Sequence, residues 1–152
     1  MKLKKIVLVV GILISTTLSL FAETHLVEMR NTNPNDPNSI NLFDPPILKI
    51  EKGDSVKFVV IDKGHNSASK KGMLPDGALP WNGRLDEEIV ITFNLDGTYG
   101  YVCIPHLGMG MVGLILVGDY MVNFDEAKKV RQRGGAKKAF RSLFEQVEMQ
   151  KF

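Results

Sequence analysis

Residues 99–117 constrain this chain more than any other stretch, because two apolar, strand-like runs flank a short loop rich in glycine. The loop carries the single cysteine, Cys103, followed by His106 and Met111 at the spacing Cys-x2-His-x4-Met. Thiolate, imidazole and thioether groups suit copper better than calcium or magnesium. A cysteine or a methionine alone is more often a packed apolar side chain. It is the combination within nine residues that predicts a metal site.

A blue-copper site needs a second histidine in addition to a cysteine, a histidine and a weak axial methionine. His65 is the obvious candidate, because it follows a β-branched run at residues 55–61 that predicts a strand. A residue just past the end of a rigid strand is well placed to act as a ligand. The remaining histidine, His25, stands alone near the N-terminus, and we interpret it as a strand residue without a catalytic role.

The first 22 residues are typical of an export signal. Three lysines precede an apolar or hydroxylated run from Ile6 to Phe21, and Ala22 is a plausible cleavage position. The run is shorter than the ~20 residues of a membrane span. We therefore predict a signal peptide at residues 1–22 and a periplasmic mature chain that starts at Glu23, with no stable membrane insertion. A retained N-terminal anchor is the alternative.

Charge and cysteine content narrow the possible functions. Removal of residues 1–22 takes away three lysines and no acidic residue, so the formal charge changes from +2 to −1. Residues 23–124 are acidic overall and residues 125–152 are basic, but neither imbalance is large enough to indicate nucleic-acid binding. A single exported cysteine cannot close an internal disulfide, and ligation to a metal would protect its sulfur from oxidation.

Short runs separated by turn signals predict an all-β domain at residues 23–123. The strands are expected at residues 25–29, 47–51, 55–61, 89–93, 99–103 and 112–117. Residues 31–39 are expected to form a loop, residues 41–46 an irregular edge, and residues 70–85 a long surface loop in which Trp81 covers one end of the core. With no helix before residue 123, this pattern predicts an antiparallel β-sandwich.

Residues 124–152 change to helical patterns, and Gly134 and Gly135 separate two stretches. In the second stretch an apolar stripe at spacing i, i+3, i+4, i+7 is formed by Phe140, Leu143, Phe144 and Val147. We expect this stripe to pack the helix on the sandwich. A helix on a membrane surface is the alternative, because the same segment is basic.

Four motifs are specific enough to be compared with known families. They are Asp-Lys-Gly-His-Asn at residues 62–66, Lys-Gly-Met-Leu-Pro-Asp-Gly-Ala at 71–78, Tyr-Gly at 99–100, and the segment 103–117. Together with the two C-terminal helices they resemble the pseudoazurins, small periplasmic blue-copper proteins of the cupredoxin superfamily. The resemblance covers essentially the whole mature chain. It implies an eight-stranded Greek-key sandwich, one copper ion per chain, and single-electron transfer instead of enzymatic turnover.

Carried over residue by residue, the resemblance implies that the copper ligands are His65, Cys103, His106 and Met111. Met109 competes for the axial position, and we choose Met111 because the family uses the later methionine. Asn66 and Pro105 are expected beside the ligands. Because proline has no N–H group, Pro105 cannot donate a hydrogen bond to the cysteine sulfur.

Docking is expected around His106, through which the electron would leave. The apolar part of this surface is expected to comprise Pro105, Leu107 and Met109, and its basic part Lys63, Lys70 and Lys71. The resemblance implies a copper nitrite reductase or a c-type cytochrome as partner. Val102 stands where many pseudoazurins have a lysine. Because the sandwich body is acidic overall, electrostatic steering should be weaker here than in a relative with a ring of lysines. The alternative interpretation of the three lysines is ordinary solvated surface charge.

Two other functions remain open from the sequence. A periplasmic copper carrier would bind Cu(I) through methionines, for which Met73, Met109 and Met111 are available. A copper enzyme would need a second metal site or an open coordination position, and the isolated His25 offers neither.

Overall fold

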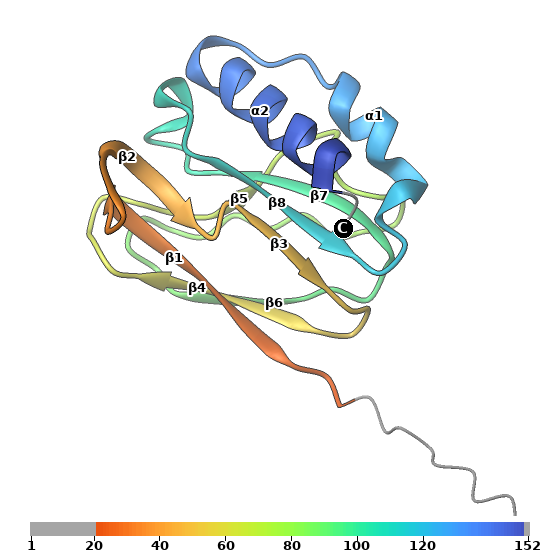
Figure 1. Ribbon diagram of the computed structural model, residues 1–152. Coiled ribbons are helices and arrows are strands. Elements are labelled where there is room, and N and C mark those ends of the chain that lie inside the picture. Colours follow the sequence, from red (N-terminus) through yellow and green to blue (C-terminus); the bar gives the residue numbers. More distant parts are fainter. Residues whose placement is uncertain (1–20, 151–152) are drawn as a thin grey trace, which may run out of the picture.

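The computed structural model describes residues 21–150, which form a sandwich of two four-stranded sheets (Figure 1). The first sheet has the order β2-β1-β4-β6, with β1 (Thr24–Asn33), β2 (Asp36–Asp44), β4 (Ser55–Val60) and β6 (Ile89–Thr92). The second has the order β3-β8-β7-β5, with β3 (Ile47–Ile50), β5 (Ala68–Ser69), β7 (Gly97–Val102) and β8 (Val112–Val117). The predicted signal peptide lies outside the described residues except for its last two.

The predicted class, a β-sandwich with two C-terminal helices, is confirmed, but the sheets are not antiparallel throughout. β1 runs parallel to β4, and β3 runs parallel to β8. The other neighbouring pairs are antiparallel. Parallel pairing is possible because a long connection, and not a tight hairpin, separates β1 from β4 and β3 from β8 in the chain.

The hairpin of β1 and β2 corrects the prediction for residues 31–46. Residues 31–39 were expected to be a loop, yet antiparallel pairing continues to Thr32 and Ile40, and only residues 34 and 35 separate the strands. Asparagine and proline are tolerated here because β2 is an edge strand, which has hydrogen-bonding partners on one side only. The consequence for the site is that Asn31 has a fixed position.

Aromatic side chains fill the space between the sheets. The ring centroids of Phe43 and Tyr101 are 4.7 Å apart, and those of Phe58 and Tyr101 are 5.1 Å apart. Trp81, expected to cover one end of the core, is itself a core residue, and its indole N–H donates to Ser67 Oγ at 3.0 Å. This packing gives the strand ends that carry the site a rigid base.

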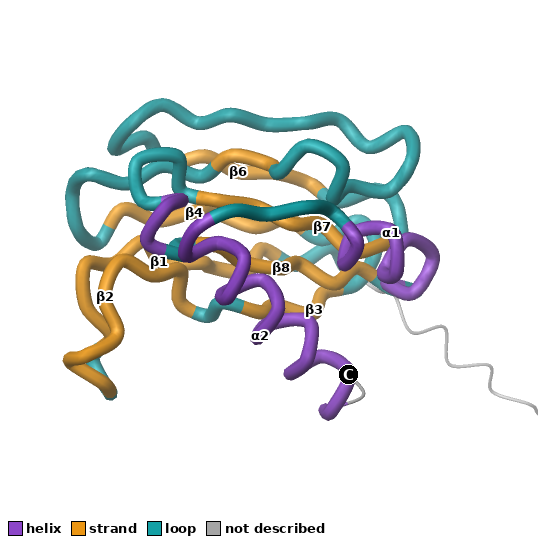
Figure 2. The backbone as a smooth tube through the Cα atoms, turned by 90° about the horizontal axis from the view of Figure 1, so that it is seen from above, coloured by secondary structure: helices purple, strands orange, loops and turns teal. Residues whose placement is uncertain are grey.

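The C-terminal segment folds back over the second sheet. It comprises the short 3-10 helix η2 (Tyr120–Asn123) and two α-helices, α1 (Phe124–Lys129) and α2 (Gly134–Gln150). A further 3-10 helix, η1 (Leu107–Met109), lies earlier in the chain, between β7 and β8. α2 lies across the outer face of the sheet (Figure 2). Its apolar stripe is buried in a cluster with Leu114 and Leu116 of β8, as the packed-helix interpretation requires. None of the helices within residues 21–150 is long and apolar enough to cross a membrane.

Asp54 fastens the start of β1 to the turn before β4. Its carboxylate accepts hydrogen bonds from the backbone N–H of Glu23 at 2.8 Å and of Glu51 at 3.0 Å, and it contacts His25 Nε2 at 2.9 Å. These contacts hold the pKa of Asp54 below its ordinary value of 3.8, and the hydrogen bond from Glu23 has the largest effect. Burial acts in the opposite direction.

This lowered pKa predicts an acid-dependent stability. Because the folded-state pKa is the lower one, Asp54 stabilises the fold fully above pH ~4, and this contribution is lost as the pH falls through the folded-state value. We expect Asp54→Asn to lower the free energy of unfolding by about 1–3 kcal/mol at neutral pH. Urea unfolding from pH 7 to pH 3 should show the two proteins converging in acid. A constant difference across that range would contradict the assignment.

Candidate metal centre

Three of the predicted ligands meet at one end of the sandwich. His65 lies in the loop after β4, Cys103 follows β7 directly, and His106 immediately precedes η1. The His65 loop turns at Gly64, whose φ of +97° favours glycine and whose N–H donates to Asp86 Oδ1 at 2.6 Å. His65 and Cys103 thus follow strands that are anchored in the core, and His106 lies three residues beyond Cys103 in the same loop.

The donor atoms of these residues form a small triangle. His65 Nδ1 lies 3.1 Å from His106 Nδ1, and Cys103 Sγ lies 3.8 Å from the first nitrogen and 3.5 Å from the second. Metal bonds of about 2.0 Å to nitrogen and 2.3 Å to sulfur give triangle edges of roughly 3–4 Å. Two imidazoles and a thiolate in this trigonal arrangement fit a copper ion, the cofactor predicted from the sequence.

Two asparagines hold the histidine and cysteine loops in place. His65 Nε2 lies 2.9 Å from Asn31 Oδ1, which fixes the ring and leaves Nδ1 for the metal. Asn66 Oδ1 accepts from the Ile104 N–H at 2.8 Å, and Asn66 Nδ2 donates to the Gly83 carbonyl at 2.9 Å. Asn66 was expected beside the ligands, whereas Asn31 was not.

Burial controls the protonation of the ligands. It raises the pKa of the Cys103 thiol, against the effect of hydrogen bonds from the backbone N–H groups of Asn66 and His106. The pKa of His65 is lowered, mainly by burial and to a smaller extent by the charge of His106. A metal ion that binds here therefore has to displace the thiol proton and meets a neutral His65 imidazole.

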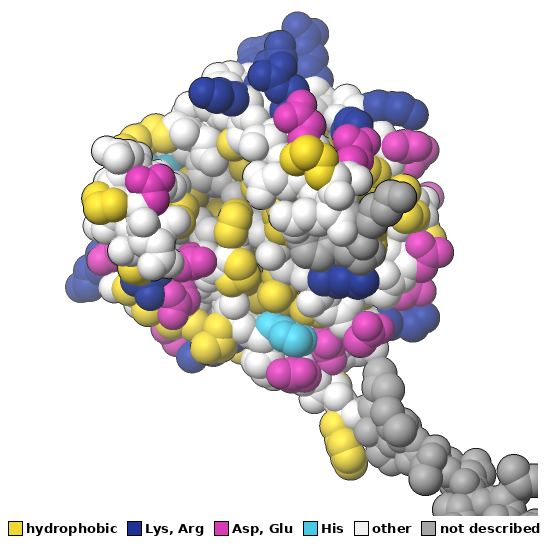
Figure 3. All heavy atoms as spheres, viewed as in Figure 1, with side chains coloured by type: hydrophobic (Ala, Val, Ile, Leu, Met, Phe, Trp, Pro, Cys, Tyr) yellow, Lys and Arg dark blue, Asp and Glu magenta, His cyan; other side chains and the backbone are white. Residues whose placement is uncertain are grey.

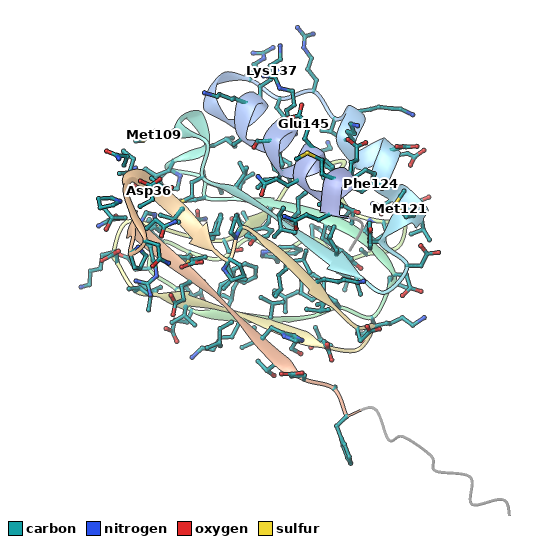
Figure 4. All side chains as sticks on the ribbon, viewed as in Figure 1. Asp36, Met109, Met121, Phe124, Lys137 and Glu145 are labelled. Atoms are coloured by element: carbon teal, nitrogen blue, oxygen red, sulfur yellow. The ribbon has the colours of Figure 1, made fainter. Side chains whose placement is uncertain are left out.

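The burial of the two competing methionines differs sharply. Met111 is 1% exposed and lies in the core cluster that contains Cys103; its carbonyl accepts from the Cys103 N–H at 3.0 Å. Met109 is 59% exposed, and Asn41 Nδ2 approaches its sulfur at 3.7 Å. Figure 4 shows Met109 at the tip of the η1 loop, directed to the outside. The buried methionine is therefore the one that shares a core cluster with Cys103.

The surface around His106 is apolar. His106 and Leu107 are half-buried, while Pro105 and Met109 are exposed, as is the neighbouring Ile104 at 53%. His65 and Cys103 are fully buried. Among the three ligands of the triangle, His106 is thus the one that approaches solvent.

Exposed basic side chains come from more elements than the loop of three lysines that the sequence indicated. Lys63 and Lys71 are exposed and Lys70 is half-buried. The turn at Gly72 lies beside Val130, so a Cβ added there would be 3.4 Å from the valine side chain. A cleft of about 420 Å³ continues from this point between α1 and α2, with a basic lining of Lys128, Arg131, Arg133, Lys137 and Arg141.

The start of α2 lies against the copper-side loop. Figure 3 shows Lys and Arg side chains gathered over the α1–α2 connection, and Figure 4 places Lys137 near the beginning of α2. These cations were not predicted as part of the site. The sequence indicated that α2 packs on the sandwich but not where along the sheet the helix lies. The signal available was the pair Gly134-Gly135, which permits a close approach to another backbone.

That close approach predicts a large effect at Gly135. A Cβ there would lie 2.5 Å from the Gly108 carbonyl oxygen, whereas a Cβ at Gly108 has nothing within 4 Å. We expect Gly135→Ala to displace η1, to lower stability by about 1–3 kcal/mol and to speed copper loss, and Gly108→Ala to leave both nearly unchanged. Thermal unfolding and copper release to a chelator measure the two effects. Equal behaviour of the two variants would contradict this contact.

The sandwich and its Cys–His triangle define a small copper-binding β protein, and comparisons place it in a family. Residues 33–118 match the family model for copper binding proteins of the plastocyanin/azurin family. A pseudoazurin of Methylorubrum extorquens is 40% identical over 91% of this chain and 91% of its own. A pseudoazurin of Paracoccus pantotrophus is 37% identical over 84% of this chain and 86% of its own. The solved structure of a Sinorhizobium pseudoazurin superposes with a TM-score of 0.79 at 40% sequence identity. The superposition covers 83% of this chain and 97% of the Sinorhizobium chain.

The chain therefore belongs to the plastocyanin/azurin family of copper-binding proteins and, within it, to the pseudoazurins. It is a blue-copper electron-transfer protein and not an enzyme. The copper-carrier alternative finds no support in the positions of its methionines. Of the three methionines named for that alternative, Met73 and Met111 are buried in different clusters and Met109 is exposed, so their sulfurs do not form a common surface site.

Proposed function

We propose that the protein carries single electrons between periplasmic redox proteins, with copper held by His65, Cys103, His106 and Met111. The observation that carries this proposal is the triangle of three donor atoms, all within 4.8 Å of one another. Burial of Met111 beside Cys103 supports it as the axial ligand.

Bound copper would supply the one-electron chemistry, and the chain's own residues keep the ligands in one geometry. Asn31 orients His65, Asn66 ties the His65 loop to Ile104, and the backbone bond from Cys103 to Met111 closes the other loop. Ligands that cannot rearrange hold both oxidation states in similar surroundings. Little atomic movement then accompanies each transfer, so the transfer is fast.

His106 gives the electron its shortest route to the surface, because it is the ligand of the triangle that reaches solvent. The surrounding apolar side chains, such as Ile104 and Met109, exclude water when a partner docks. A carrier must also leave its partner quickly, which favours a small contact with an apolar centre and a charged rim.

The charged rim suits an acidic partner, for which we propose a copper nitrite reductase or a c-type cytochrome. Lys63, Lys70 and Lys71 supply one part of it. The cations at the start of α2, Arg133 and Lys137 among them, supply the other, because α2 begins against η1. Such a rim raises the association rate in a salt-dependent way.

Stopped-flow electron transfer to a copper nitrite reductase at several ionic strengths tests this surface. We expect Lys71→Glu and Arg133→Glu to slow the second-order rate several-fold at low salt and to converge on the parent at high salt. Lys52→Glu is the matched control, since Lys52 lies in the turn before β4, away from η1, and pairs with Asp96 at 3.3 Å. Equal rates for all three variants would exclude steering by this rim.

A further inference from the structure

The predicted mature N-terminus brings metal-binding groups together away from the copper centre. If processing follows Ala22, as the sequence predicts, the chain begins Glu23-Thr24-His25. Glu23 N lies 2.8 Å from Asp54 Oδ1, and His25 Nε2 lies 2.9 Å from Asp54 Oδ2. The new α-amine and the imidazole of one three-residue segment thus converge on a single carboxylate.

A histidine in the third position gives such a segment four nitrogen donors. They are the α-amine of Glu23, the backbone nitrogens of Thr24 and His25, and Nδ1 of the His25 ring. Four nitrogens in a plane favour Cu(II) or Ni(II). We propose that the processed segment Glu23-Thr24-His25 is a second metal site of this protein, which binds Cu(II) or Ni(II) in a square plane.

The ring of His25 is already oriented for this role. Its Nε2 contacts Asp54, so Nδ1, the nitrogen nearer to its own backbone, stays available. A carboxylate on the second ring nitrogen is the usual partner of a metal-binding histidine. The side chain of His25 is 22% exposed, so the ring is also accessible to an ion from solvent.

The backbone of the segment is held on one side only. β1 pairs with β4 from Thr24 onward, but its pairing with β2 begins at Glu28. Wrapping a metal would release residues 23–25 from β4 and give up the bond from the Ser55 N–H to the Glu23 carbonyl, 2.8 Å long. The rest of β1 remains in the sheet, so the change costs only contacts of these first residues.

The two metal sites lie at opposite ends of the first sheet. Thr24 pairs with Ser55 at the start of β4, and His65 follows the end of that strand, whose six residues span about 20 Å. Figure 1 shows the start of β1 at the end of the sandwich away from η1. Copper in the Cys103 site and an ion at the N-terminus therefore bind independently.

Binding at the N-terminus is coupled to proton release. The amide nitrogens of Thr24 and His25 each lose a proton to solvent when they bind the ion, and the α-amine must be neutral. The affinity should therefore increase with pH.

The test uses protein produced with Glu23 as its first residue and with the Cys103 site already loaded with copper. We expect calorimetry to show one further equivalent of Ni(II) bound, with proton release and the absorption of square-planar nickel. His25→Ala should abolish this binding. A glycine placed before Glu23 should also abolish it, since the histidine then moves to the fourth position. Thr24→Ala is the matched control and should bind like the parent.

Each other outcome counts against the site. A parent protein that binds no further Ni(II), or binding that survives both His25→Ala and the added glycine, would overturn the proposal. Retained copper–thiolate absorption shows that each variant is folded. The mass of the exported protein tests the processing step separately. A first residue other than Glu23 would exclude this site in the exported protein and leave the Cys103 site unaffected.

Discussion

Cys103→Ser is expected to abolish the intense visible absorption of the Cu(II) protein, because a hydroxyl cannot replace the soft anionic sulfur that produces it. Cys103 is fully buried and its sulfur faces both histidine nitrogens, so no other donor in residues 21–150 stands in its place. We also expect copper affinity to fall by more than about 100-fold, since residues that only support a ligand already account for 10–100-fold.

Absorption and copper competition with a chelator measure both effects. The control is the unfolding of the copper-free proteins. Serine is similar in size to cysteine and keeps the backbone bond to Met111, so we expect nearly equal stabilities. Visible absorption that persists in the variant would show that the thiolate is not the ligand.

Met111→Gln is expected to retain copper and to lower the reduction potential, because an oxygen donor stabilises Cu(II) over Cu(I). A shift of at least about 60 mV corresponds to a tenfold change in the relative affinity for the two oxidation states. Met109→Gln is the matched control, since this side chain is 59% exposed while Met111 is 1% exposed. We expect voltammetry to show little change for it.

The opposite result would reassign the axial ligand. If the potential moved in Met109→Gln and stayed constant in Met111→Gln, the exposed methionine would have to turn inward in the copper protein. The buried position of Met111 in the cluster with Cys103 would then have a purely packing role.

The triangle of donor residues could be predicted from the sequence because its chemistry is local. Cys103, His106 and Met111 lie close together in one segment, and His65 lies a few residues beyond a strand whose β-branched pattern is clear. The supporting contact from Asn31 could not be predicted. It depends on the pairing of β1 with β2, where asparagine and proline favour a loop by their own preferences.

The relative direction of the strands and the basic rim at the start of α2 also could not be predicted from the sequence. The parallel pairing of β1 with β4 is a property of the chain's path between distant segments, and no residue pattern within either strand encodes it. Likewise, the apolar stripe of α2 predicted that the helix packs on the sheet but not where the helix begins. The contact of Gly135 with Gly108 fixes that position and brings Arg133 and Lys137 toward the copper side.

The most direct test of the central claim is copper K-edge X-ray absorption of His25→Ala protein loaded with one equivalent of Cu(II), since this variant lacks the second site proposed at the N-terminus. The account predicts a first shell of two nitrogen donors and one short copper–sulfur contact, as the triangle of His65, Cys103 and His106 requires. A first shell of nitrogen and oxygen alone, without short sulfur, would contradict it.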